Sequence, residues 1–354
     1  MKLILSRRDL IKKSAYAAVL SGLPGHLAFA EKVVNRLVFS SSKVNGSALL
    51  SILSFYNDKT YTFKINNELH SFLKSKNLVF GLPKFDRTLV IFDLNNNKLS
   101  QIETRKFHKF SGHGVANGDF LHTIEINSKN NKSYAVTRNL RNKKISEIKD
   151  LNIKFAHDIK SINNKFYISC KKENAGIFIY DKDFSFETQV SFQDSNIVPG
   201  GLVRNNDELI VLPAKKDLHK EKIVLTPHYL KKGKLRSYKS SKNLKGSELL
   251  SGSVVSRKIF TTDTKNNRIL IWDTKKKKLR NSLSFPTPSG LEFFNGKIFV
   301  NSKEQAQQAF INPSSEKFVK KFNYRAINSS HILTHTTDIW IQVATIKLAV
   351  AKLL

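Results

Sequence analysis

Residues 259–285, IFTTDTKNNRILIWDTKKKKLRNSLSF, decide the fold of this 354-residue chain. The stretch holds three short segments rich in β-branched and aromatic residues, separated by turns rich in Asn, Lys and Asp. Such a pattern is typical of short antiparallel strands joined by tight turns. A single small sheet of this kind cannot bury both of its faces, so its recurrence along the chain decides the architecture.

The same unit occurs in seven copies at spacings of 39 to 50 residues. The copies begin at Leu37, Leu78, Leu121, Phe166, Leu209, Ile259 and Ile298. One more short segment precedes most copies, as at residues 112–117, 155–162 and 289–295, which gives four strands per unit. A period of about 40 to 50 residues with four short strands is typical of a propeller blade. The sequence therefore predicts an all-β, seven-bladed β-propeller over residues 31–346.

The first copy lacks a preceding segment, and a candidate for it stands at the other end of the chain, at residues 329–334 followed by 338–341. A C-terminal innermost strand in the first blade would close the ring and leave no long free edge. The alternative is a β-sandwich followed by a second β domain, but no Pro-rich or Gly/Ser-rich linker divides the chain. Residues 347–354, KLAVAKLL, fit no blade and are expected to form a separate C-terminal tail.

The first 30 residues have the pattern of an export signal. The pair Arg7 and Arg8 is followed by an apolar run at 15–23 and by the small residues Ala28 and Ala30. This order is typical of a twin-arginine signal with cleavage after Ala30. The apolar run is shorter than the roughly 20 residues that a membrane-spanning helix needs. We therefore expect a folded product released into the periplasm, which touches the membrane only through the signal before cleavage.

The chain carries 60 Lys and Arg against 28 Asp and Glu, a formal net charge of +32. Such an excess attracts polyanions. Lysine runs such as residues 275–278 are, however, typical of solvated turns, and export removes chromosomal nucleic acid as a partner.

Cys170 is the only cysteine, so no intramolecular disulfide forms. Its place in a β-rich segment predicts a buried side chain. We expect a monomer.

Four of the ten histidines occupy one position in the repeat, eight or nine residues before an aligned strand: His70, His113, His157 and His331. They belong to blades two, three, four and one, which are neighbours in the predicted ring. Neutral imidazoles that converge with a carboxylate suit a transition metal such as Fe, Cu, Zn or Ni. Glu125 and Asp158 are the candidate carboxylates. The sequence thus suggests a ligand site, with a transition metal as candidate cofactor, at the mouth of the central channel.

Two other interpretations of these histidines stay open at this point. Each could cap a turn or bond a neighbouring blade, or the group could bind an anion or small molecule. Blades five to seven carry small residues near this position, at 200–201, 251–252 and 289–290, which would leave one side of the mouth open. The chain has no CxxCH, HExxH or GxSxG motif and no phosphate-binding glycine loop, so an enzyme is not the first expectation.

Several motifs resemble those of the domain-of-unknown-function family 1513. They are SGHGV at 111–115, LHTIEIN at 121–127, AHD at 156–158, AGIFIYD at 175–181 and RILIWD at 268–273. The resemblance implies a seven-bladed propeller similar to WD-repeat and quinoprotein-like propellers, exported by the twin-arginine route. It also implies an accessory role in iron or other metal handling, with periplasmic iron-uptake or redox proteins as partners.

Three functions are compatible with these features. The first is an exported, non-enzymatic binding propeller that holds a metal, a small ligand or a partner at its channel mouth. The second is a metal-dependent hydrolase or quinoprotein-like enzyme, but such sites gather several carboxylates around a hard cation and only Glu125 and Asp158 are well placed here. The third is an envelope protein whose positive charge binds polyanions.

Overall fold

The computed structural model describes residues 30–44, 47–54, 59–216, 223–240, 244, 246–294, 296–302, 304–305, 307–323 and 333–342. These residues form 28 β-strands and, within these ranges, no helix. Accordingly, none of the described residues belongs to a helix that could cross a membrane. The predicted signal at 1–30, apart from Ala30, and the predicted tail at 347–354 lie outside the described residues.

The strands form seven antiparallel sheets of four. From the innermost strand outward, blade one is β28 (Leu333–Gln342), β1 (Ala30–Val44), β2 (Ser47–Ser54), β3 (Lys59–Ile65); blade two is β4 (Leu69–Ser75), β5 (Leu78–Pro83), β6 (Thr88–Asp93), β7 (Lys98–Glu103). Blade three is β8 (His108–Asn117), β9 (Phe120–Asn127), β10 (Lys132–Asn139), β11 (Ile145–Lys154); blade four is β12 (Ala156–Ile162), β13 (Lys165–Cys170), β14 (Gly176–Tyr180), β15 (Phe186–Val190). Blade five is β16 (Ile197–Asn205), β17 (Glu208–Lys215), β18 (His228–Lys231), β19 (Lys234–Ser237). Blade six is β20 (Leu249–Val255), β21 (Lys258–Asp263), β22 (Arg268–Asp273), β23 (Lys278–Ser284); blade seven is β24 (Pro288–Phe294), β25 (Lys297–Ser302), β26 (Gln307–Asn312), β27 (Lys317–Asn323).

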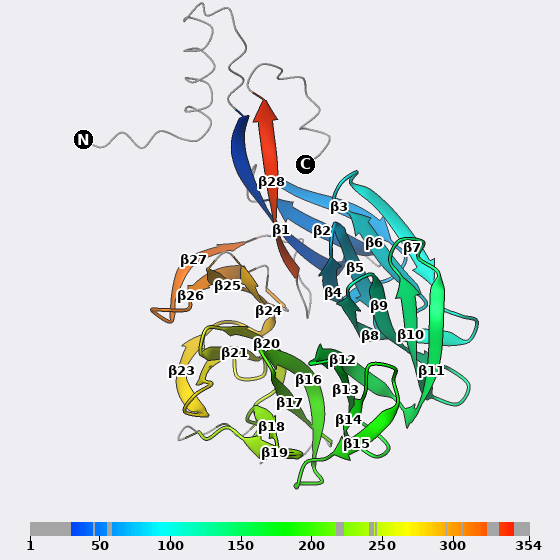
Figure 1. The fold of residues 1–354 in the computed structure, drawn as a ribbon. Coiled ribbons are helices and arrows are strands. Elements are labelled where there is room, and N and C mark those ends of the chain that lie inside the picture. The colour runs from blue at the N-terminus through cyan, green and yellow to red at the C-terminus, as the bar shows by residue number, and fades with distance from the viewer. Residues whose placement is uncertain are drawn as a thin grey trace, which may run out of the picture.

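The seven sheets are arranged in a ring around a central axis (Figure 1). Each innermost strand contacts the next, in the order β4, β8, β12, β16, β20, β24 and β28, and β28 contacts β4 in turn. This arrangement confirms the predicted seven-bladed β-propeller and excludes a sandwich with a second domain.

The ring is closed by pairing between the first and the last of the described strands. The C-terminal strand β28 pairs antiparallel with the N-terminal strand β1, from Ala30 opposite Gln342 to Phe39 opposite Leu333 (Figure 1). The prediction of an innermost C-terminal strand in the first blade is confirmed. The strand includes the predicted segment 338–341 but begins at Leu333, and residues 329–332 lie outside the described part of the chain.

The hydrophobic core lies between blades rather than within them. Each of six buried clusters draws its residues from two consecutive blades. Between blades two and three, for example, Phe80 and Ile91 pack with Phe110 and Leu121. The inner strands are therefore buried on both faces, which explains why β5 and β6 are almost continuously apolar while the outermost strand β7 is mostly polar and partly exposed.

The polar turns have a structural explanation. Asp93, Asp273 and Asn312 end the third strand of their blades, and each accepts a hydrogen bond from the backbone N–H two residues on, at 2.8 to 2.9 Å. This turn is one that Asp and Asn favour because their side chains mimic a backbone carbonyl. In the lysine run that follows Asp273 most side chains are exposed, but Lys277 pairs with Glu208 at 2.6 Å.

Candidate metal centre

The innermost strands carry β-bulges at the position where the histidines stand. In β4 one extra residue, His70, interrupts the pairing between Leu69 opposite Pro83 and Ser71 opposite Leu82. Similar interruptions enclose His113 in β8 and His157 in β12. A bulge adds a residue on one strand and re-aims the side chain at that point. The repeated bulge therefore explains why three histidines of three blades occupy one position in the fold.

The structure brings His70, His113 and His157 together. Their candidate ligand nitrogens all lie within 4.8 Å of one another. The ring centroids of His70 and His113 are 4.9 Å apart, those of His113 and His157 are 4.9 Å apart, and those of His70 and His157 are 6.1 Å apart. Nitrogens that share one zinc ion lie about 3.3 Å apart, since each Zn–N bond is about 2.0 Å. The 4.8 Å limit exceeds that spacing, so the rings would have to move for all three nitrogens to bind one ion.

The fourth histidine of the predicted set, His331, lies outside the described residues, two positions before β28 begins. Its membership of the group stays a prediction.

Asp158 lies beside the group and contacts one of its histidines. Its Oδ1 is 3.5 Å from Nδ1 of His113, and its two oxygens accept hydrogen bonds from the backbone N–H groups of Ile159 and Leu202, both at 2.7 Å. Burial alone would raise the pKa of Asp158, but the Lys160 ammonium, His157 and the Leu202 amide together hold it below its usual value. Asp158 is thus a carboxylate positioned to orient His113, a role that such partners commonly have beside metal-binding histidines.

His157 is held in the form that binds metals. Burial, and then the charges of His113, Lys171 and Lys84, lower the pKa of His157 well below its usual value, and Asp158 opposes them only in part. The imidazole is therefore neutral at pH 7. Neutral imidazole is the form that coordinates a transition metal.

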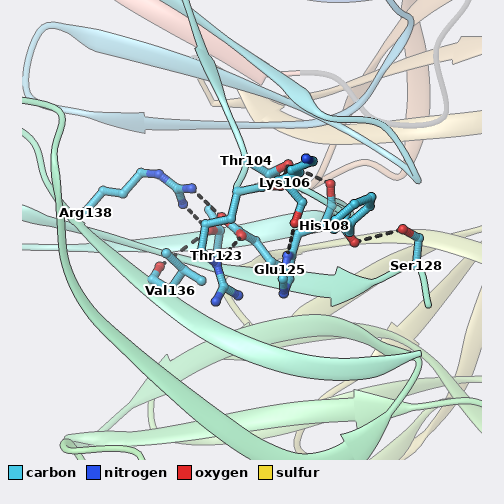
Figure 2. A network of polar contacts seen from close by, with 10 residues as sticks. Thr104, Lys106, His108, Thr123, Glu125, Ser128, Val136 and Arg138 are labelled. Carbon is cyan, nitrogen blue, oxygen red and sulfur yellow. Dashed lines mark hydrogen bonds and ion pairs between the residues drawn. The ribbon is translucent and has the colours of Figure 1, made fainter. Parts of the chain in front are cut away.

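Glu125, the other candidate carboxylate, is not brought to the histidines. It is fully buried within blade three, where its Oε1 pairs with Arg138 and its Oε2 lies 3.3 Å from Nε of Arg105. Figure 2 shows Glu125 beside Arg138 and Thr123, and Thr123 also accepts a hydrogen bond from Arg138 at 2.8 Å. Glu125 therefore belongs to a buried ion-pair network that joins strands within this blade.

A cavity of about 620 Å³ opens beside the histidines, and all three line it. Gly200 and Gly201 of blade five also line it, and the expectation that small residues leave one side of the mouth open stays a prediction. His113 also lines a second cavity of about 460 Å³, together with Asp158 and Lys160. His113 thus borders both cavities.

Gly112 supports the position of His70. Its φ is +108°, and a Cβ at this residue would lie 2.7 Å from Cδ2 of His70. Both the backbone conformation and the space therefore require glycine.

We expect Gly112→Ala to displace His70 and to lower the free energy of unfolding by about 1 to 3 kcal/mol. Metal affinity should fall with it, as measured by titration of the folded variant. Gly118→Ala is the matched control, because Gly118 also has a positive φ of +57° but nothing within 4 Å of its Cβ position. Loss of metal affinity in the Gly118 variant as well would contradict this role.

The sequence interpretation missed the lysines of the larger cavity. Six line it: Lys84, Lys171, Lys172, Lys215, Lys216 and Lys265. A signal was present, because in each of the seven copies a lysine stands where the second strand ends: Lys43, Lys84, Lys129, Lys171, Lys215, Lys265 and Lys303. Lysines next to turns are usually solvated, which makes this regularity easy to overlook.

Comparison with solved structures finds other proteins with a similar fold. Apo AztD from Citrobacter koseri superposes with a TM-score of 0.59 at 9% identity, covering 86% of this chain and 98% of that one. The chain is similar to known propellers in fold alone. A second AztD structure from the same organism gives 0.56 at 8% identity, with 87% and 99% covered, and the computationally designed Ika8 protein gives 0.56 at 7%, with 91% and 96% covered. No family model and no curated protein matches the sequence, so the resemblance to family 1513 stays a prediction.

Proposed function

We propose that this protein is a non-enzymatic binding propeller that holds a transition-metal ion in its channel through His70, His113 and His157. The observation that carries the proposal is the approach of three histidine nitrogens to within 4.8 Å. The three histidines come from three different strands, β4, β8 and β12, so the site requires blades two, three and four to pack side by side.

The chemistry of the ligand set favours Zn, Cu, Ni or Fe over calcium or magnesium. Imidazole nitrogen suits first-row transition metals, whereas hard cations prefer oxygen ligands. Three protein ligands leave a fourth position open on a tetrahedral metal, and all three histidines line the larger cavity, from which a further ligand could come.

The larger cavity offers few groups for metal-dependent hydrolysis, so binding is the first proposal. Hydrolysis at a metal needs a base or acid near the bound water. Glu248 is the only carboxylate among the described residues that line the larger cavity, and its side chain is exposed to solvent. Asp158 is engaged by Leu202, Ile159 and Lys160.

The cellular setting is also a proposal, and it is supported by the sequence alone. The twin-arginine pattern at 1–30 supports export to the periplasm, and the resemblance to family 1513 supports an accessory role in iron or other metal handling beside uptake or redox proteins. Fractionation of cells that express the chain with Arg7→Lys/Arg8→Lys would test export, because the variant should stay in the cytoplasm.

Metal binding is tested directly on the purified protein. Metal-free protein should take up about one Co²⁺ per chain, with the intense visible absorption of a tetrahedral cobalt site, and Zn²⁺ should abolish that absorption by displacement. Elemental analysis after gel filtration measures the stoichiometry. Protein that emerges without metal, and without a cobalt spectrum, would refute the proposal.

A further inference from the structure

The larger cavity is strongly basic. Six lysines and one carboxylate, Glu248, are the charged side chains among the described residues that line it, apart from the histidines. A concave site lined by charges of one sign focuses the electrostatic potential and concentrates ions of the opposite sign. The cavity is therefore a poor environment for a bare cation and a good one for an anion.

Most of these lysines have no carboxylate partner within the described part of the chain. Elsewhere in the ring lysines form ion pairs, as Lys165 does with Glu187 and Lys258 with Glu316. No ion pair with a described carboxylate is formed by five of the cavity lysines, namely Lys84, Lys171, Lys172, Lys215 and Lys216. Burial in the first place, and then the neighbouring Lys84, lower the pKa of the half-buried Lys171 to about 8.

The lysines and the histidines lie at the same end of the blades because of strand pairing. In blade two Leu69 pairs with Pro83, so the residues that follow them, His70 and Lys84, lie on either side of this residue pair. In blade four Ala156 pairs with Cys170, which places His157 and Lys171 in the same relation. In four blades the lysine at the end of the second strand lines the cavity: Lys84, Lys171, Lys215 and Lys265.

We propose that this cavity binds a small polyanion with several carboxylate or phosphate oxygens, held by the lysines, with one oxygen at the open position of the histidine-bound metal. The second part rests on the proposed metal site, whereas the first part does not. Three neutral imidazoles do not compensate the charge of a divalent metal ion, and six lysines add positive charge beside it. A polyanion neutralises the charge of the metal ion and that of the lysines. The cavity volume of about 620 Å³ suits a small molecule rather than a polymer chain.

Calorimetric titration with citrate and with pyrophosphate tests the proposal, on metal-free and on Zn²⁺-loaded protein at low ionic strength. We expect binding of at least one anion to both forms, tighter to the loaded form. Comparison of citrate with pyrophosphate distinguishes a carboxylate ligand from a phosphate ligand. Absence of binding of either anion to either form would overturn the proposal.

Two double variants locate the site. Lys171→Gln/Lys215→Gln should weaken anion binding by at least about tenfold, because it removes two charge-assisted contacts. The same variant should bind bare Zn²⁺ as tightly as the wild type or more tightly, since repulsion is reduced. Lys106→Gln/Lys129→Gln is the matched control, since Lys106 and Lys129 both lie over the Phe107 ring. Equal weakening in both variants would show a general charge effect and would overturn the site.

His113→Ala separates the two proposals. If the metal site and the anion site both exist, this variant loses metal but binds the anion as metal-free wild type does. If the wild type binds the anion but never metal, the metal proposal fails and the lysine site stands. If the wild type binds metal, and neither anion changes the Zn²⁺ affinity or the cobalt spectrum, the anion does not reach the metal, and that part of the inference is wrong.

Discussion

Replacement of His113 by alanine is expected to weaken Zn²⁺ and Co²⁺ binding by more than about 100-fold, because loss of a group that merely orients a ligand already costs about 10- to 100-fold. His113 is the central imidazole of the three, with ring centroids 4.9 Å away on both sides. It is also the one that Asp158 approaches, at 3.5 Å. Competition with a chelating dye of known affinity measures the change.

The matched control is His122→Ala. His122 is also buried in blade three, where Nδ1 lies 3.0 Å from the Thr137 hydroxyl and the ring packs on Phe166, away from the metal-ligand group. Its removal should lower stability while metal affinity stays within about twofold, as expected for distant sites. Equal losses of affinity in the two variants would mean that the effect is general destabilisation and not loss of a ligand.

The architecture was predictable because each blade carries its own complete pattern. The copy at Ile259 alone gives three strands and two turns, and seven such copies leave few arrangements besides a ring. Closure by the C-terminal strand followed from the missing segment before Leu37. The exact start of β28 at Leu333 was not predictable, because strand ends depend on pairing with β1 rather than on local preference.

The histidine group was predictable for the same reason, since one repeat position means one place in the ring. Glu125 shows where this reasoning stops. Spacing places Glu125 on the strand after His113, but the bulge between Phe110 and Gly114 shifts the alternation of side chains along β8. Counting residues along the chain therefore does not tell on which face of the sheet a carboxylate lies. In the structure Glu125 pairs with Arg138 of β10 and not with the histidines.

Glu125→Gln is expected to lower the free energy of unfolding by about 3 to 5 kcal/mol and to leave metal affinity within about twofold. Glu125 is fully buried and its partner Arg138 is 1% exposed, so neutralising the carboxylate leaves a buried guanidinium without its countercharge. Arg105, over the ring of Tyr134, loses its countercharge as well. Urea unfolding at pH 7 measures the stability, and the dye competition measures the metal.

The control for this prediction lies in the same blade. Glu147 pairs with Lys149 at 3.2 Å, but both side chains are about half exposed, so Glu147→Gln should change stability by less than about 1 kcal/mol. Replacing both members of the buried pair, as Glu125→Leu/Arg138→Met, should recover part of the stability lost in Glu125→Gln, because no charge is then left facing an apolar partner at that contact. If Glu125→Gln instead kept full stability and lost metal, Glu125 would be a ligand, and the buried ion pair would not be its role.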